Sequence, residues 1–169
     1  MISFPFSNGG FLQLNYGENM ECLLESLVAI FEHIGGVPTE IWFDNTRTIV
    51  TKGIYGGGRD ITERFQHFCE RCRIKPIFMN LESGWEKGNV ENKVGYLRRN
   101  EFVPVTSFDD LTEENKHLLE RCETDMHREH YDDDADRFIR ELFEEDKACL
   151  LLLPSIPFDT ALYTNETTD

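Results

Sequence analysis

The chain of 169 residues is long enough for one domain with a hydrophobic core, since 40% of its residues are hydrophobic and 13 are phenylalanine. Its longest apolar run, residues 148–153, is far too short to cross a bilayer, and the N-terminus lacks the regions of a secretory signal, so we expect a cytoplasmic protein without membrane contact. The odd number of cysteines, five, without such a signal indicates reduced thiols.

The net charge of −15 is unevenly distributed along the chain. Residues 47–100 carry eleven Lys and Arg against six Asp and Glu, whereas residues 1–46 carry no basic residue and residues 101–169 carry twenty acidic residues against six basic ones. A local basic surface is what contacts with phosphate groups require. We therefore expect any contact with nucleic acid within residues 47–100. The acidic C-terminal part should lie away from the nucleic acid or act on another protein.

The first 35 residues predict a hairpin and a helix. Residues 2–6 and 11–16 have the composition of strands, and the four residues Ser7-Asn8-Gly9-Gly10 between them are a hairpin turn signal. Apolar residues then recur at helical spacing over residues 20–34, and Gly35-Gly36 ends that predicted helix.

The next segment predicts a strand, a loop, a helix and a second strand. Residues 40–43 form a short strand that ends at Asp44, and residues 45–60 form a glycine-rich loop that lacks the Gly-Lys-Ser/Thr of a phosphate-binding loop. Residues 60–72 predict a helix whose apolar face includes two cysteines, and residues 75–80 predict a strand. Buried thiols are favoured over a metal or redox pair, because no second Cys-x-x-Cys follows.

Residues 85–100 predict a helix after the turn signal Ser83-Gly84. One of its faces carries a single carboxylate among cations and a glycine, namely Lys87, Glu91, Gly95 and Arg98. Such a face suits a site that holds a phosphate near a divalent metal, although a solvated amphipathic helix is the simpler interpretation of this stretch by itself. A carboxylate at a strand end, Asp44, and another on a later helix, Glu91, can converge on metal ions as two-metal phosphoryl transfer requires.

The composition changes after residue 104, where we place a domain boundary between residues 1–104 and an acidic helical extension, residues 105–169. Apolar spacing predicts a long helix within residues 108–130 and another around residues 138–143. Residues 150–157 are apolar and are interrupted by two prolines, Pro154 and Pro157.

Two groups of motifs together resemble the IstA-type insertion-sequence transposases, which belong to the retroviral-integrase-like DDE group. The first group is Gly35-Gly36-Val37-Pro38 with Ile41-Trp42-Phe43-Asp44-Asn45, and the second is Glu86-Lys87-Gly88-Asn89-Val90-Glu91-Asn92 with Gly95-Tyr96-Leu97-Arg98-Arg99-Asn100. The resemblance runs from Phe4 to Pro157. It implies an α/β fold with a ribonuclease-H-like core, and an activity in DNA transposition through metal-dependent phosphoryl transfer.

The same resemblance assigns roles to particular residues. Asp44 matches the second Asp and Glu91 the Glu of the catalytic Asp-Asp-Glu set, so both are expected catalytic residues and ligands of Mg²⁺ or Mn²⁺. Contacts with the DNA phosphates are expected from four cations of the second motif group, Lys87, Lys93, Arg98 and Arg99. DNA is the expected partner, together with a second copy or a full-length transposase.

The chain departs from the family pattern at its beginning, because no acidic residue precedes Glu18. We therefore expect the first strand, its catalytic Asp and the N-terminal DNA-binding region of the family to be missing, so that the chain is a truncated transposase of low stability and little strand-transfer activity. Whether it acts as an enzyme is left open. Two alternatives remain: a non-catalytic module that binds nucleic acid or the transposase, and a small nuclease that recruits Glu86 or Glu18.

Overall fold

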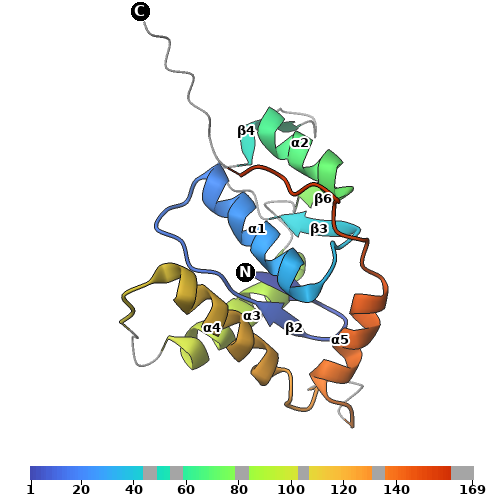
Figure 1. Ribbon diagram of the computed structural model, residues 1–169. Coiled ribbons are helices and arrows are strands. Elements are labelled where there is room, and N and C mark those ends of the chain that lie inside the picture. Colours follow the sequence, from blue (N-terminus) through green and yellow to red (C-terminus); the bar gives the residue numbers. More distant parts are fainter. Residues whose placement is uncertain (44–48, 54–58, 79–83, 103–106, 131–135, 161–169) are drawn as a thin grey trace, which may run out of the picture.

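The computed structural model describes residues 1–43, 49–53, 59–78, 84–102, 107–130 and 136–160; for residues 50–53, 59–61 and 84–92 it describes the backbone alone. The fold is mixed α/β, with five helices and three two-stranded sheets among the described residues (Figure 1). Helix α1 crosses the molecule between two groups of elements, with α2, β3 and β6 on one side and the N-terminal hairpin with α3, α4 and α5 on the other.

The chain begins with an antiparallel hairpin of β1 (Ile2–Phe4) and β2 (Gly9–Phe11), in which Phe4 pairs with Gly9. The predicted hairpin is confirmed, but its strands differ from the predicted bounds. Strand β1 ends at Phe4, and β2 begins earlier than predicted and ends at Phe11, so residues 12–16 of the predicted second strand form no strand. The turn closes before the two glycines because Asn8 takes a left-handed conformation with φ 57°, which asparagine tolerates better than most residues. Both glycines are consequently strand residues, buried against α3 and α5.

Helix α1 (Met20–Ile34) follows the predicted bounds. The side chain of Asn19 accepts a hydrogen bond from the backbone N–H of Cys22 at its start, and Gly35 ends it with φ 81°. The apolar stripe is buried along its length, through Leu24, Leu27, Ile30, Phe31 and Ile34. The helix therefore forms where both its capping residues and its apolar period predict it.

Strands β3 (Glu40–Phe43) and β6 (Lys75–Phe78) pair in parallel, with Phe43 opposite Phe78. In the sequence, the segment between β3 and β6 contains an antiparallel pair, β4 (Val50–Gly53) and β5 (Arg59–Ile61), followed by helix α2 (Glu63–Cys72). The prediction of a loop over residues 45–60 was therefore wrong for the residues of β4 and for Arg59 and Asp60 of β5. The second helix begins later than predicted because Thr62 caps it, accepting from the N–H of Phe65.

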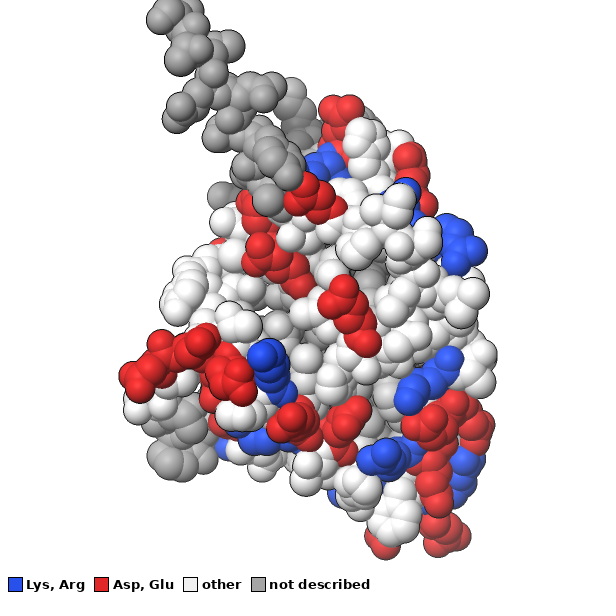
Figure 2. Space-filling model, in the orientation of Figure 1, with Lys and Arg blue, Asp and Glu red and all other residues white. Residues whose placement is uncertain are grey.

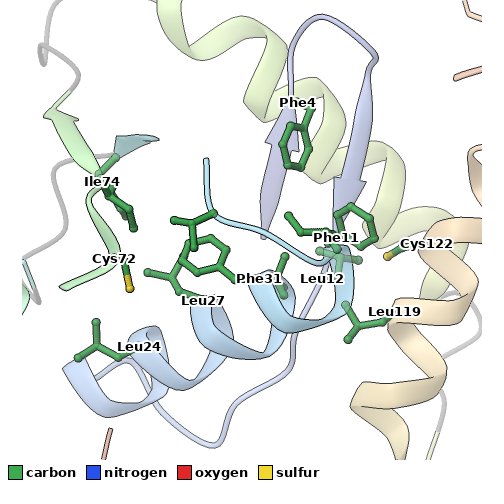
Figure 3. Packing of buried hydrophobic residues seen from close by; sticks show 14 of the residues in the cluster. Phe4, Phe11, Leu12, Leu24, Leu27, Phe31, Cys72, Ile74, Leu119 and Cys122 are labelled. Atoms are coloured by element: carbon green, nitrogen blue, oxygen red, sulfur yellow. The ribbon is translucent and has the colours of Figure 1, made fainter. Parts of the chain in front are cut away.

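Helices α3 (Gly84–Glu101), α4 (Leu111–Asp125) and α5 (Ile139–Ala148) complete the fold. Their buried side chains join those of α1, α2 and the strands in one hydrophobic cluster. Figure 3 shows α1 inside this cluster, with Cys72 and Ile74 on one side and Phe11, Leu119 and Cys122 on the other. Residues on both sides of the predicted domain boundary therefore contribute to a shared core.

The surface reflects the acidic composition of the chain. On the face seen in Figure 2, acidic side chains gather over α4 and α5 and lie across α1. None of the helices formed by the described residues combines the length and apolar character needed to cross a membrane.

Candidate functional site

The parallel pair β3–β6 determines where the predicted catalytic positions follow in the chain. Because Phe43 pairs with Phe78, the carboxyl ends of both strands lie at the same edge of this small sheet. Asp44 is the next residue after β3, and α3 follows β6 after five residues. The two segments that carry the predicted carboxylates, Asp44 and Glu91, therefore both follow strands that end at this edge.

The side chains of the two predicted metal ligands, Asp44 and Glu91, lie outside the part of the chain that is described. Asp44 lies outside the described residues, and Glu91 and Lys87 belong to the part of α3 for which only the backbone is described. The predicted proximity of the Asp44 and Glu91 carboxylates stays a prediction. Among the residues that the structure does describe, no group of three or more His, Cys, Asp or Glu could hold a metal ion.

The side chains in the C-terminal half of α3 are described, and its cations differ in burial. Lys93 is buried, as is its neighbour on the helix Leu97, whereas Arg98 and Arg99 are exposed in the last turn. Cations in a last helical turn are stabilised by the helix dipole. A Cβ built on Gly95 would lie 3.2 Å from Nη1 of Arg99, so the guanidinium lies over this glycine. Arg98 and Arg99 remain available as phosphate contacts.

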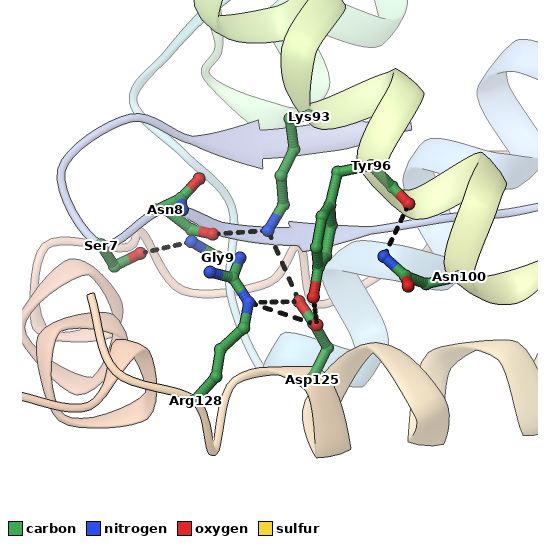
Figure 4. A network of polar contacts seen from close by, with 8 residues as sticks. All are labelled: Ser7, Asn8, Gly9, Lys93, Tyr96, Asn100, Asp125 and Arg128. Carbon is green, nitrogen blue, oxygen red and sulfur yellow. Dashed lines mark hydrogen bonds and ion pairs between the residues drawn. The ribbon is translucent and has the colours of Figure 1, made fainter. Parts of the chain in front are cut away.

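Lys93 has a different environment from the one predicted for it (Figure 4). Only 5% of its side chain is exposed, and Nζ donates a 2.7 Å hydrogen bond to the carbonyl of Asn8 in the hairpin turn. The same ammonium lies 3.6 Å from Oδ2 of Asp125 at the end of α4. Because its ammonium group faces the interior, Lys93 is less suited to a phosphate contact than an exposed cation, and its predicted contact with DNA stays a prediction.

Asp125 contacts the side chains of Lys93, Tyr96 and Arg128 where α3 meets the hairpin turn and the end of α4, a place called the junction here. Oδ1 accepts a 2.7 Å hydrogen bond from the hydroxyl of Tyr96, and Nε of Arg128 lies 3.2 Å from both carboxylate oxygens. The guanidinium of Arg128 also lies 4.7 Å from the centre of the Tyr96 ring. One carboxylate thus faces two cations and a phenol, and 14% of its side chain is exposed.

The electrostatics of the junction follow from burial. Desolvation lowers the pKa of Lys93, and the nearby charge of Arg128 lowers it further, while Asp125 acts in the opposite direction. Burial raises the pKa of Tyr96, and its hydrogen bond to Asp125 acts in the same direction. The Asp125 carboxylate is therefore the group that compensates the buried charge of Lys93.

A glycine makes room for the buried lysine. A Cβ on Gly10 would lie 2.9 Å from Cε of Lys93, a distance at which atoms must move apart. The stem of the lysine thus lies close to β2 at a position where the strand has no side chain. A second contact, in which Arg121 of α4 pairs with Glu101 of α3 at 2.8 Å, holds the end of α3 against α4.

Asn8, Asp125 and Arg128 were not identified from the sequence. No local signal could have identified them, because Asn8 lies 85 positions from Lys93 and Asp125 lies 29 positions from Tyr96.

The expectation of buried thiols at Cys69 and Cys72 agrees with the structure. Both thiols are buried, and desolvation raises the pKa of Cys69 to about 12. Such thiols are poor metal ligands and nucleophiles at neutral pH.

No protein-family model matches the chain. The chain is 37% identical over 102 residues to a transposase of Aminobacter aminovorans, a match that covers 60% of this chain and 20% of that protein. It is 28% identical over 144 residues to the transposase for insertion sequences IS1326/IS1353 of Pseudomonas aeruginosa, covering 85% of this chain and 28% of the relative. A transposase for an IS21-like insertion sequence element of Bacteroides fragilis is 31% identical over 93 residues, covering 54% and 18%.

The chain therefore spans less than a third of the length of these curated relatives. All three carry the name of transposase, and two are named for insertion sequences. This similarity supports the predicted relationship to insertion-sequence transposases.

Proposed function

We propose that the chain contributes to DNA transposition as part of the catalytic region of an IstA-type DDE transposase with a ribonuclease-H-like core. The similarity to insertion-sequence transposases supports the process. The parallel β3–β6 pair, with α3 following β6, is the single observation that supports the location of the site. Ligand-binding residues of parallel strands commonly lie at the carboxyl ends of those strands.

In this proposal Asp44 and Glu91 hold the metal. Two carboxylates suit Mg²⁺, which proteins bind through one or two carboxylates together with water and substrate phosphates. When bound, the divalent ion neutralises charge on the reacting phosphate group. Two carboxylates hold a pair of ions loosely, so we expect little strand transfer from this chain by itself.

The DNA backbone would be held by the exposed end of α3. Arg98 and Arg99 both reach solvent in the last turn, and planar guanidinium groups match the geometry of phosphate oxygens. Lys87, earlier on the same helix, stays a predicted contact. Because the chain as a whole is strongly acidic, we expect the affinity to be low and strongly dependent on salt.

The metal site is tested by titrating the chain with Mn²⁺ and measuring the free ion by electron paramagnetic resonance. Asp44→Asn and Glu91→Gln should each weaken Mn²⁺ binding, because each removes one charged ligand. Glu120→Gln, on the exposed side of α4, removes the same charge elsewhere and should leave binding unchanged. Equal binding by all four proteins would contradict the proposed site.

DNA binding is tested with the double variant Arg98→Gln/Arg99→Gln. The slope of log affinity against log salt should fall in magnitude by about 2, since each lost phosphate contact removes about 0.9. Lys116→Gln/Lys147→Gln is the matched control, since it removes two cations from α4 and α5. If the Arg98→Gln/Arg99→Gln pair weakened DNA binding while Asp44→Asn and Glu91→Gln left Mn²⁺ binding intact, the non-catalytic nucleic-acid module would be the better description.

A further inference from the structure

The segment after α5 lies along the surface of the molecule and is held there by contacts with its backbone. Residues 150–160, called the strap here, leave the end of α5 and run between α1 and α2 (Figure 1). The strap is joined to the body at its start, where Leu151 and Val37 exchange backbone hydrogen bonds of 2.8 and 2.9 Å. Beyond that bridge it forms no helix or strand.

Arginines of α2 and its C-cap bind the main chain of the strap. Arg73 donates to the carbonyl of Leu152 at 3.3 Å, and Arg71 donates to the carbonyl of Ile156 at 3.0 Å. Arg64 donates to the carbonyl of Thr160 at 2.5 Å. The strap therefore runs antiparallel to α2, and these contacts recognise its backbone rather than its side chains.

The side chains of the strap are only partly used. The ring of Phe158 packs edge-on against Phe68 of α2, with 5.2 Å between ring centres. In contrast, Leu152 and Ile156 are 82% and 64% exposed. A cavity of about 220 Å³ remains under the strap, lined among others by Phe31, Cys72, Leu153, Pro154 and Phe158. The strap thus covers an apolar groove without filling it.

We propose that the groove between α1 and α2 is a binding site for an extended polypeptide segment, and that the strap of a second copy of this chain can replace the chain's own strap. Every copy presents the same carbonyl groups and the same phenylalanine, so an exchanged strap makes the same contacts. Residues 150–158 carry no charged side chain, whereas the whole chain has a net charge of −15, so the strap is a part of a second copy that acidic surface does not repel.

Exchange has a low cost and a gain. The guanidinium–carbonyl contacts of Arg71 and Arg73 lie at the exposed surface, where such hydrogen bonds are readily replaced by water. Leu152 and Ile156 face solvent when the strap stays on its own body, and in a pair of exchanged straps they can be covered by the neighbouring copy. This inference does not depend on the proposed role in transposition.

The binding test uses a fluorescent peptide of residues 150–160 and the full chain, with fluorescence anisotropy as the readout. The variant Phe158→Ala should bind the peptide more tightly than the wild-type chain, by about two- to tenfold, because its own strap competes less well for the groove. In that background Arg71→Gln should weaken peptide binding, whereas Arg140→Gln, at an exposed position of α5, should not. A peptide that itself carries Phe158→Ala should bind more weakly.

Thiol labelling gives an independent readout of the same groove. Cys72 is buried beneath the strap, Cys149 is exposed before it, and Cys122 is buried on the other side of the molecule. Phe158→Ala should label faster at Cys72, with Cys122 still protected, and the added wild-type peptide should restore the protection. Restoration by a peptide is an effect that loss of a structural contact alone would not give.

Several outcomes would overturn the proposal. The proposal would be overturned if the peptide bound neither the wild-type chain nor the Phe158→Ala variant. It would also be overturned if the rate of Cys72 labelling were unchanged in Phe158→Ala. If that variant also labelled at Cys122, the surface variant Arg71→Gln replaces it; it too should label faster at Cys72, and unchanged labelling there would equally refute the proposal. Sedimentation of the wild-type chain should show dimers that form as concentration rises, and a chain that stays monomeric at every concentration would refute exchange with a second copy.

Discussion

The junction of α3 with the hairpin and the attachment of the strap to α2 are both formed by cations that bind oxygen atoms, but the cations differ in burial. Lys93 is almost fully buried and pairs with a carboxylate, whereas Arg71 is exposed and donates to a neutral carbonyl. A buried charge that loses its partner is strongly destabilising, whereas exposed polar contacts exchange easily with water. The difference indicates a permanent junction at α3 and a replaceable contact at α2.

The largest effect is expected at the centre of the junction. Asp125→Ala leaves Lys93 and Arg128 without their shared carboxylate, and should lower the free energy of unfolding by about 3 kcal/mol. Unfolding in urea, followed by circular dichroism, measures the change. Glu120→Ala on the exposed side of the same helix is the control, and its effect should stay within about 0.5 kcal/mol. If the two variants lost similar amounts of unfolding free energy, the contacts of Asp125 would contribute no more to stability than an exposed glutamate does.

The next effect concerns the space for the lysine. Gly10→Ala places a methyl group 2.9 Å from Cε of Lys93, and should destabilise the fold by about 1–3 kcal/mol through overpacking. Gly17→Ala is the matched control, because its added Cβ would meet nothing within 4 Å and its backbone needs no left-handed conformation. Urea unfolding again measures both. If Gly10→Ala were as well tolerated as Gly17→Ala, the lysine stem would have room to move.

The helices and the strands show how far sequence patterns can predict this fold. Helix α1 was predicted to the residue, because its capping residues and its apolar period agree locally. The β4–β5 pair was missed because its glycine-rich neighbourhood indicates a loop, and β2 begins earlier than predicted because Asn8 closes the turn. Local patterns thus determined the helices well and the short strands poorly.

Side-chain partners distant in the sequence were beyond prediction. The sequence groups Lys93 with Arg98 and Arg99 as cations of one helix, and only the tertiary structure separates them, because its partners come from the hairpin and from α4. The sequence shows most of the strap as an apolar run interrupted by two prolines, but nothing in it indicates that three arginines would bind its backbone. The order Asp44, then Glu91, is visible in the sequence, while their distance stays a prediction.

A smaller effect is expected where the strap meets α2. Arg71→Gln removes one exposed guanidinium–carbonyl contact and should change the free energy of unfolding by no more than about 0.5 kcal/mol. Urea unfolding in the same buffer as for Asp125→Ala allows a direct comparison of the two regions. A loss as large as that of Asp125→Ala would mean that the strap is as firmly attached as the junction, which would contradict the proposed exchange.

The smallest effect is a dependence on pH at the other side of the hairpin turn. Burial raises the pKa of Asp146 in α5, and hydrogen bonds from Ser7 only partly oppose this. A carboxyl group with a raised pKa in the folded state contributes stability that is fully present below its ordinary value of about 3.9 and is lost as pH rises through the raised value. Asp146→Asn removes this titration. The stability of the variant relative to the wild-type chain should therefore increase from about pH 4 to about pH 7, measured by urea unfolding at each pH. A difference that stayed constant with pH, or that changed in the opposite direction, would show that the folded state does not disfavour the Asp146 carboxylate.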